Sequence, residues 1–154
     1  MKIGRWIVSL AWLAAALGAA VPVAMAQEGA KAKASIWSGV YTAAQSKRGQ
    51  ELYSGACAHC HGAKLNGAAA PDQPPSPAIA RVGFLRKWQG KPVAALFDYV
   101  HTLMPPDAPG TLNAQQAIDA IAYMFAVSSI PPGDKELPPD PKALAEIAIE
   151  AESK

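Results

Sequence analysis

Cys57-Ala58-His59-Cys60-His61 is the run of residues from which this sequence is best interpreted. A C-x-x-C-H motif is the attachment site of a c-type haem. Each thiol can add across one haem vinyl group to form a thioether, and His61 is then placed to give its imidazole to the iron. The motif predicts one haem c, bound covalently through Cys57 and Cys60, with His61 as the proximal ligand.

Two other interpretations of the cysteine pair have less support. A thioredoxin-like redox dithiol is expected within a βαβ pattern, which the sequence does not show. A zinc site needs further ligands, and the chain offers only His59 and His101 besides His61. The histidine directly after the second cysteine favours haem.

The N-terminal segment predicts export. Two basic residues precede an apolar run over residues 7–21, and Ala24-Met25-Ala26 then fits an A-x-A cleavage site. This pattern is typical of a cleaved secretory signal peptide over residues 1–26, and it predicts a periplasmic location. The alternative is an uncleaved anchor, but the run is shorter than the ~20 residues that a membrane span needs. We therefore expect no stable membrane insertion after cleavage.

The remaining chain is long enough for one small domain. We divide it into an N-terminal extension (27–42), a central domain (43–130) and a Pro-rich C-terminal tail (131–154). Residues 1–26 carry two of the 14 basic residues and none of the 12 acidic ones, so the rest of the chain is close to neutral. This balance gives no indication of nucleic-acid binding.

Apolar periodicity and capping residues predict an all-α fold of about four to five helices with long Pro-rich loops. No alternating strand of useful length is visible. Pro92 is expected in the first turn of its helix, and Asn113 as an N-cap. The helices are expected at residues 42–57, 84–88, 92–102 and 113–127, with a possible short one at 142–150.

The second axial ligand is the next question. Met104 is favoured because it follows a helix in a loop bounded by Pro105, where its side chain is free to turn inward. Met124 falls within a helix among apolar residues, which is typical of core packing. His101 is a rival, whereas His59 is held away from the iron by the two cysteine anchors.

The central domain carries, in this order, Arg48-Gly49, Leu52-Tyr53, C-x-x-C-H, a Pro-rich loop, Met104-Pro105 and Ala122-Tyr123. These motifs in this order resemble those of the class I mono-haem cytochromes c. The N-terminal flank reads Ile36-Trp37-Ser38-Gly39-Val40-Tyr41-Thr42, and it resembles a subset of periplasmic cytochromes that accompany quinoprotein dehydrogenases.

The resemblance implies a class I cytochrome c fold wrapped around one haem. Phe84 would pack on the haem, and Trp88 would lie near a haem propionate. Gly49 would mark a close crossing of the first and last helices of the domain, with Tyr123 packed against it. The family offers a backbone carbonyl of a Pro-Leu pair to the proximal histidine. Here the corresponding stretch is Pro77-Ala78-Ile79, which leaves that carbonyl undetermined.

The expected function is electron transfer rather than enzyme catalysis, because two axial ligands leave no open position at the iron. The resemblance implies a periplasmic dehydrogenase, of the quinoprotein class in related proteins, as electron donor and an oxidase or another cytochrome as acceptor. One alternative is a permanently bound haem subunit of a dehydrogenase. Residues 37–41 and the C-terminal tail would then form its interface, or they could simply cover the domain's own core. Another is a haem enzyme such as a peroxidase, for which only His101 is available as a distal residue.

A basic stretch runs from residue 81 to residue 91 without an intervening acid. It is either an ordinary solvated face or a docking surface for an acidic partner, whose association would then be sensitive to salt. Its members are Arg81, Arg86, Lys87 and Lys91.

Overall fold

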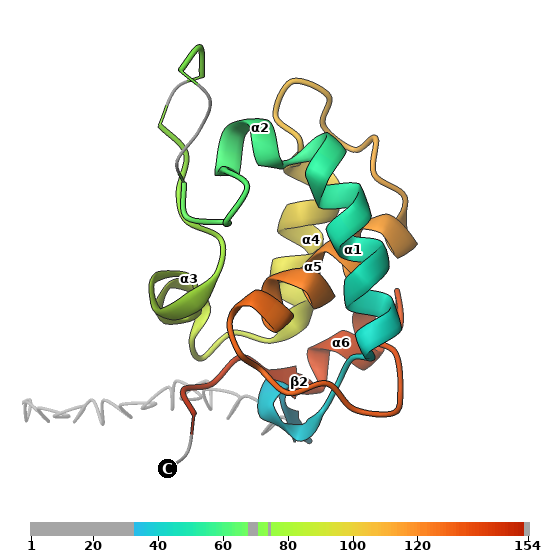
Figure 1. Cartoon of the computed structure of the whole chain (residues 1–154). Coiled ribbons are helices and arrows are strands. Elements are labelled where there is room, and N and C mark those ends of the chain that lie inside the picture. The colour runs from blue at the N-terminus through green and yellow to red at the C-terminus, as the bar shows by residue number, and fades with distance from the viewer. Residues whose placement is uncertain (1–32, 68–70, 74, 153–154) are drawn as a thin grey trace, which may run out of the picture.

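The computed structural model describes residues 33–67, 71–73 and 75–152, and within these residues it is mostly helical (Figure 1). The expected signal peptide over 1–26 lies outside the described residues. The elements are β1 Ala34–Ser35, the 3-10 helix η1 Ile36–Ser38, α1 Ala43–Ala56, α2 Ala58–His61, α3 Arg81–Trp88, α4 Val93–Leu103, α5 Ala114–Val127, α6 Pro141–Ala145 and β2 Ile147–Ala148. The all-α prediction is confirmed, and α2, a single turn, is the helix that it did not include.

The starts of α1 and α5 follow the capping chemistry of the sequence. α1 begins after Thr42, whose side chain accepts a hydrogen bond from the Gln45 amide at 3.1 Å. α5 begins after Asn113, which forms a reciprocal capping box with Gln116. Pro92 is the N-cap of α4 and precedes the first turn in which it was expected.

The crossing of α1 and α5 is tight because Gly49 has no side chain. A Cβ at Gly49 would lie 1.9 Å from the Asp119 carbonyl oxygen and 3.0 Å from the Tyr123 Cβ, so any larger residue would push the helices apart. One turn further along α1, the ring of Tyr53 packs on that of Tyr123, with centroids 5.4 Å apart. The crossing expected from the resemblance is confirmed.

From an exposed position on α1, Arg48 stabilises the same crossing with salt bridges. Its guanidinium donates to both carboxylate oxygens of Asp119 on α5 and to both of Glu136 in the tail, at 2.8–3.1 Å. The pairing with Arg48 lowers the pKa of Glu136. This network ties α1, α5 and the tail together.

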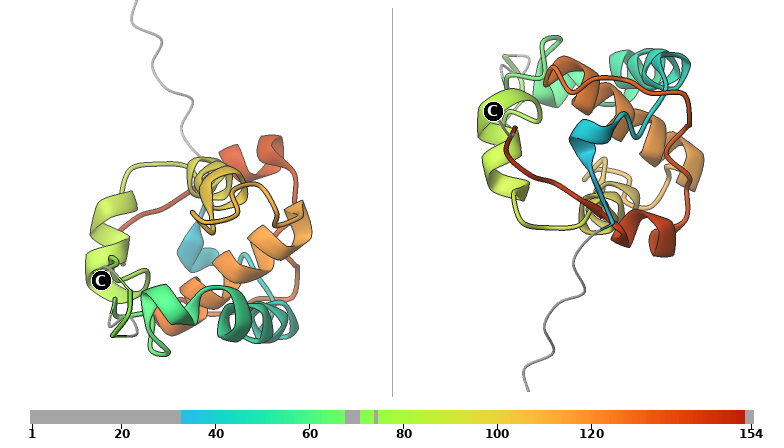
Figure 2. Two further views of the ribbon diagram at one scale, coloured as in Figure 1. Left: turned by 90° about the horizontal axis from the view of Figure 1, so that it is seen from above. Right: turned by 90° about the horizontal axis from the view of Figure 1, so that it is seen from below.

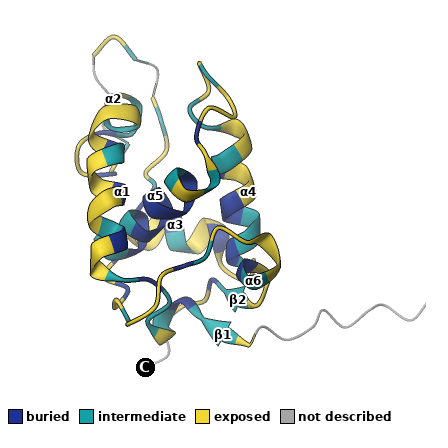
Figure 3. Ribbon diagram, turned by 90° about the vertical axis from the view of Figure 1, so that its right-hand side faces the viewer, coloured by how far each residue is buried: buried dark blue, intermediate teal, exposed yellow. Residues whose placement is uncertain are grey.

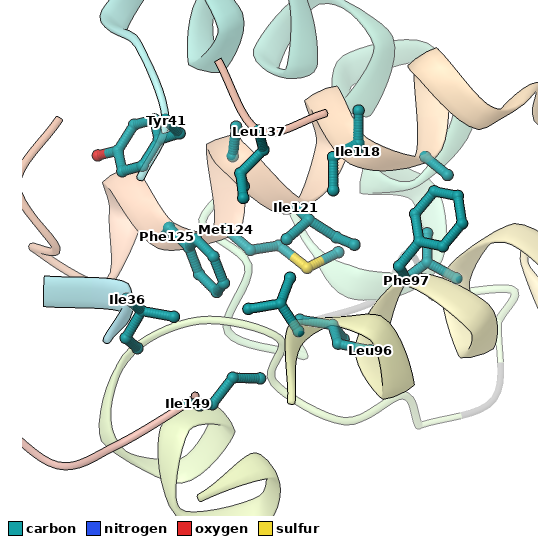
Figure 4. Close-up of a cluster of buried hydrophobic side chains, with 14 of the residues drawn as sticks. Ile36, Tyr41, Leu96, Phe97, Ile118, Ile121, Met124, Phe125, Leu137 and Ile149 are labelled. Atoms are coloured by element: carbon teal, nitrogen blue, oxygen red, sulfur yellow. The ribbon is translucent and has the colours of Figure 1, made fainter. Parts of the chain in front are cut away.

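The core combines side chains from α4 and α5 with others from both terminal segments (Figure 4). Met124 is 5% exposed and lies among these apolar side chains, as its position in the sequence predicted. Figure 3 shows that the buried positions of the helices face inward and the exposed ones outward. The core residues labelled in Figure 4 are Ile36, Tyr41, Leu96, Phe97, Ile118, Ile121, Met124, Phe125, Leu137 and Ile149.

The N-terminal extension and the C-terminal tail are joined by strand pairing and a side-chain hydrogen bond. β1 pairs in parallel with β2, and the Trp37 indole nitrogen donates to the Glu150 carbonyl at 3.0 Å. Ile36 and Tyr41 are at most 1% exposed. Tyr41 thus forms part of the domain's own core, and Trp37 and Val40 pack against it partly buried.

The helix expected over 142–150 is wrong in its second half. α6 ends at Ala145, and the chain then becomes extended. The physical reason is tertiary pairing: the Ile149 amide donates to the Lys91 carbonyl at 2.9 Å, and the Gly90 amide donates to the Ile149 carbonyl at 2.8 Å. These bonds and the pairing with β1 replace the helical ones.

Helices α1, α3, α4 and α5 surround a common centre when the molecule is seen from above and below (Figure 2). α2 extends from the end of α1 toward the side on which α3 lies (Figure 1). In the part of the chain that the structure describes, no helix is long and apolar enough to cross a membrane.

Candidate haem site

One cavity, of about 280 Å³, brings together all six residues predicted for the site. They come from three parts of the fold: α2 and the residue before it, α3, and the residue that follows α4. The six are Cys57, Cys60, His61, Phe84, Trp88 and Met104.

The two thiols and the imidazole share one turn of chain. The amides of Cys60 and His61 both donate to the Cys57 carbonyl, at 3.2 and 2.9 Å, and this closes the turn. Burial, and secondarily the charge of Cys60, raise the pKa of Cys57 to about 11. A reactive redox dithiol needs a lowered thiol pKa. The Cys57 environment therefore argues against the thioredoxin-like interpretation.

The Pro77 carbonyl is the hydrogen-bond acceptor beside His61. His61 Nδ1 lies 3.0 Å from the carbonyl oxygen of Pro77. A carbonyl only accepts hydrogen bonds, so in the neutral ring this contact places the proton on Nδ1 and leaves Nε2 with a free lone pair. Such an outer hydrogen bond fixes the ring orientation of a metal-binding histidine. The stretch 77–79 supplies the acceptor despite its departure from the Pro-Leu pattern.

Met104 is the C-cap of α4, and its extended backbone (ψ 145°) takes the chain out of the helix. It lines the cavity together with Pro105 and Pro106. Met124 lines the cavity as well, from the middle of α5, so lining alone does not separate the two methionines. What separates them is packing, since Met124 belongs to the buried core cluster and Met104 does not.

The rival histidines lie elsewhere. His101 stacks on Phe97, with ring centroids 5.3 Å apart, and His59 is exposed with its Nε2 3.6 Å from the Asp72 carboxylate. Among the described residues that line the cavity, neither histidine is present.

The walls of the cavity are mostly apolar. Phe84 and Trp88, one turn apart on α3, are 2% and 7% exposed. The remaining buried lining residues are Leu96, Val100, Leu112, Ala120 and Met124. One imidazole, thioether sulfurs and two thiols on an apolar cavity fit a haem c, whose macrocycle needs a dry, apolar surround. They do not fit a structural zinc site, which takes four nitrogen, sulfur or carboxylate ligands.

Residues 44–124 match the family model described as cytochrome c oxidase, cbb3-type, subunit III. The match spans more than half of the 154-residue chain. The chain belongs to this family of c-type cytochromes. A cytochrome c domain implies a haem and a role in electron transfer.

Other comparisons are more distant. The sulfane dehydrogenase SoxCD from Paracoccus pantotrophus is similar in structure with a TM-score of 0.38 and 17% sequence identity, over 61% of this chain and 53% of that one. The cytochrome thus spans about half of the length of that chain. No curated protein matches the sequence significantly.

Several residues of the cavity were not predicted from the sequence. Tyr99 of α4 and Lys87 of α3 are two of them. The Lys87 Nζ lies 5.7 Å from the Tyr99 ring centroid and 5.9 Å from that of Trp88. The sequence gives one signal for Lys87, its position beside Trp88. The contact with Tyr99 joins two helices and is visible only in the fold.

Proposed function

We propose that this cytochrome is a periplasmic single-electron carrier with one haem c, bound covalently through Cys57 and Cys60 and ligated axially by His61 and Met104. The observation that carries the proposal is the convergence of these four side chains on one apolar cavity. Electron transfer itself follows from the family.

Each residue has a defined part in this proposal. His61, held by the Pro77 carbonyl, would present Nε2 to the iron, and Met104, placed by the end of α4, would present its sulfur. When bound, the haem supplies a one-electron redox couple, and a thioether ligand favours its reduced state. If His61 and Met104 hold the haem in this way, no position at the iron would remain for a substrate. This arrangement favours a carrier over a peroxidase.

The side of the cavity near the cysteines is the proposed route for the electron. Of the lining residues on this side, Ala56, Pro77 and Ala78 are exposed. The edge of the haem that the thioethers hold would therefore lie close to the surface. A short path through an exposed edge suits transfer to a docked protein.

The partners are inferred from chemistry and from resemblance. A dehydrogenase, of the quinoprotein class in the cytochromes that this chain resembles, would be the donor, and an oxidase or another cytochrome the acceptor. The signal-peptide pattern of residues 1–26 supports the periplasm as the compartment. The alternative is a permanent haem subunit of a dehydrogenase, and it would have to use what residues 37–41 and the tail leave exposed after their contacts with each other and with the core.

Covalent attachment gives a direct test. Protein expressed with a periplasmic haem-attachment system should have the mass of the chain after residue 26 plus one haem, and acid-acetone should extract no haem from it. Cys57→Ala and Cys60→Ala together should yield protein whose haem is extractable or absent. Free thiols at both positions in the haem-loaded wild type would contradict the proposal.

A further inference from the structure

The basic stretch of α3 and the residues after it divides between two faces of the molecule. Arg81 and Arg86 line a groove on the outer side of α3, which Glu150 and Glu152 of the tail also line. Lys87 lines the haem cavity instead. The sequence groups these cations together, but the fold gives Lys87 a separate environment.

Two aromatic rings hold the Lys87 ammonium at the cavity. Its Nζ lies within 5.9 Å of the centroids of Trp88 and Tyr99, and both of these residues line the cavity too. An ammonium at this distance from a ring face is attracted by the ring's negative electrostatic potential. The side chain is exposed, yet these contacts direct its charge to the cavity wall.

The charge on the side chains that line the cavity is positive, with no acidic residue to balance it among the described lining residues. Among the described residues that line it, Lys87 is the one with a permanent charge, and no aspartate, glutamate or arginine is present. A haem c carries two propionate carboxylates on the edge away from its thioether bonds. A carboxylate at an apolar site needs an oppositely charged or hydrogen-bonding partner, because moving a charged group out of water without one costs free energy. The lining offers one cation to pair with them.

We propose that Lys87 pairs with a haem propionate and that its positive charge favours the reduced state of the iron. This inference rests on the proposed function, because it requires the bound haem. Reduction lowers the positive charge at the iron by one. A fixed cation nearby therefore stabilises the reduced form relative to the oxidised form, by an amount that falls with distance and with solvent screening. The aromatic contacts with Trp88 and Tyr99 position the cation.

Lys91 provides a matched control. Its Nζ lies 4.9 Å from the Trp88 ring centroid, closer than that of Lys87, and its side chain is also exposed. It is not among the described residues that line the cavity. Lys87→Gln and Lys91→Gln thus remove the same charge and one contact with the same ring, but only the first removes a cation from the haem site.

The test is the equilibrium constant for reduction of the haem-loaded protein, measured spectroscopically against a redox dye at low and high ionic strength. Lys87→Gln should lower this constant about fivefold at low salt, and the difference should shrink at high salt. Lys91→Gln should change it by less than about twofold, and Lys87→Arg should keep the wild-type value. Equal effects of Lys87→Gln and Lys91→Gln, or a lower melting temperature of Lys87→Gln with an unchanged constant, would overturn the inference. A wild-type protein that holds no covalent haem would instead overturn the proposed function.

Discussion

At the scale of single residues, the two proposed axial ligands are positioned by different means. His61 is oriented by one hydrogen bond to the Pro77 carbonyl, at 3.0 Å. Met104 is oriented by the end of a helix, since its own amide closes the last turn on Val100 at 3.2 Å and the chain then leaves α4. A ligand at a helix end can move with its loop, whereas one within a helix cannot. Met124, within α5, is held by its core neighbours.

The two methionines can be separated by substitution. Met104→Ala should remove the weak long-wavelength absorption band that reports iron–sulfur ligation in oxidised cytochromes c, and should lower the reduction potential. Met124→Leu conserves side-chain volume, so it should keep the band and cost less than about 1.5 kcal/mol of unfolding free energy. Absorption spectra and denaturant titrations of both variants provide the measurement. Loss of the band in Met124→Leu with its retention in Met104→Ala would reverse the assignment.

At the scale of elements, the crossing of α1 and α5 depends on backbone contact. Gly49 lies against the Asp119 carbonyl, and Arg48, the residue before it, holds the Asp119 carboxylate. Adjacent residues of α1 thus bind the same residue of α5 through its backbone and its side chain. This double contact fixes the angle and distance of the two helices, and α2 with the Cys-His turn follows directly from α1.

Gly49→Ala should destabilise the fold strongly. Its Cβ would lie 1.9 Å from a backbone atom that cannot move without moving α5, so the cost should be about 3 kcal/mol or more. Gly55, in the same helix, has nothing within 4 Å of the point that a Cβ would occupy, so Gly55→Ala should be neutral or stabilise by roughly 0.5 kcal/mol through helix propensity. Denaturant unfolding of the haem-loaded proteins measures both. Similar stabilities for the two variants would show that the helices separate at little cost.

Interactions between residues close in the sequence predicted the helices well wherever no contact with a distant segment overrides them. Asn113 was predicted as an N-cap and is one, because capping is a contact between near neighbours in the chain. The helix predicted from residue 42 begins one residue later, since Thr42 is its N-cap. The same local signals failed over 142–150, where strand pairing with distant residues replaced helical bonds. Lys87 was assigned only to a basic stretch, since its contact with Tyr99 requires α3 and α4 to be placed together. The six residues predicted from the motifs and the resemblance line one cavity, whereas the acceptor beside His61 could be identified only from the path of the loop.

At the scale of the whole molecule, both terminal segments complete the domain. The tail returns to α1, where Gln45 exchanges two hydrogen bonds of 2.9 Å with the Leu137 backbone, and then continues to β1. Gln45 is fully buried, so these bonds are made without competition from water. The segments thereby close the side of the core away from the cysteines. The surface left for a partner includes the exposed cations of α3.

Arg86 is the residue with which to test that surface. It is exposed on α3, it lines the outer groove and not the haem cavity, and no ion pair engages it within the described residues. Arg86→Glu should slow oxidation of the reduced protein by ferricyanide, an anionic probe, several-fold at low salt, because long-range attraction raises association rates. The effect should fade as ionic strength rises and charges beyond roughly 8–10 Å are screened.

Lys47→Glu makes the same charge change on an exposed position of α1 that lines neither the cavity nor the outer groove. If the α3 cations steer anions toward the haem, Lys47→Glu should slow ferricyanide less than Arg86→Glu does, although both variants alter the net charge equally. Stopped-flow rates across ionic strength separate the two, and an unchanged haem spectrum confirms that the site is intact. Equal slowing by both variants would mean that only the net charge of the protein matters. The hypothesis that the cations of α3 form a docking surface for an acidic partner would then be rejected.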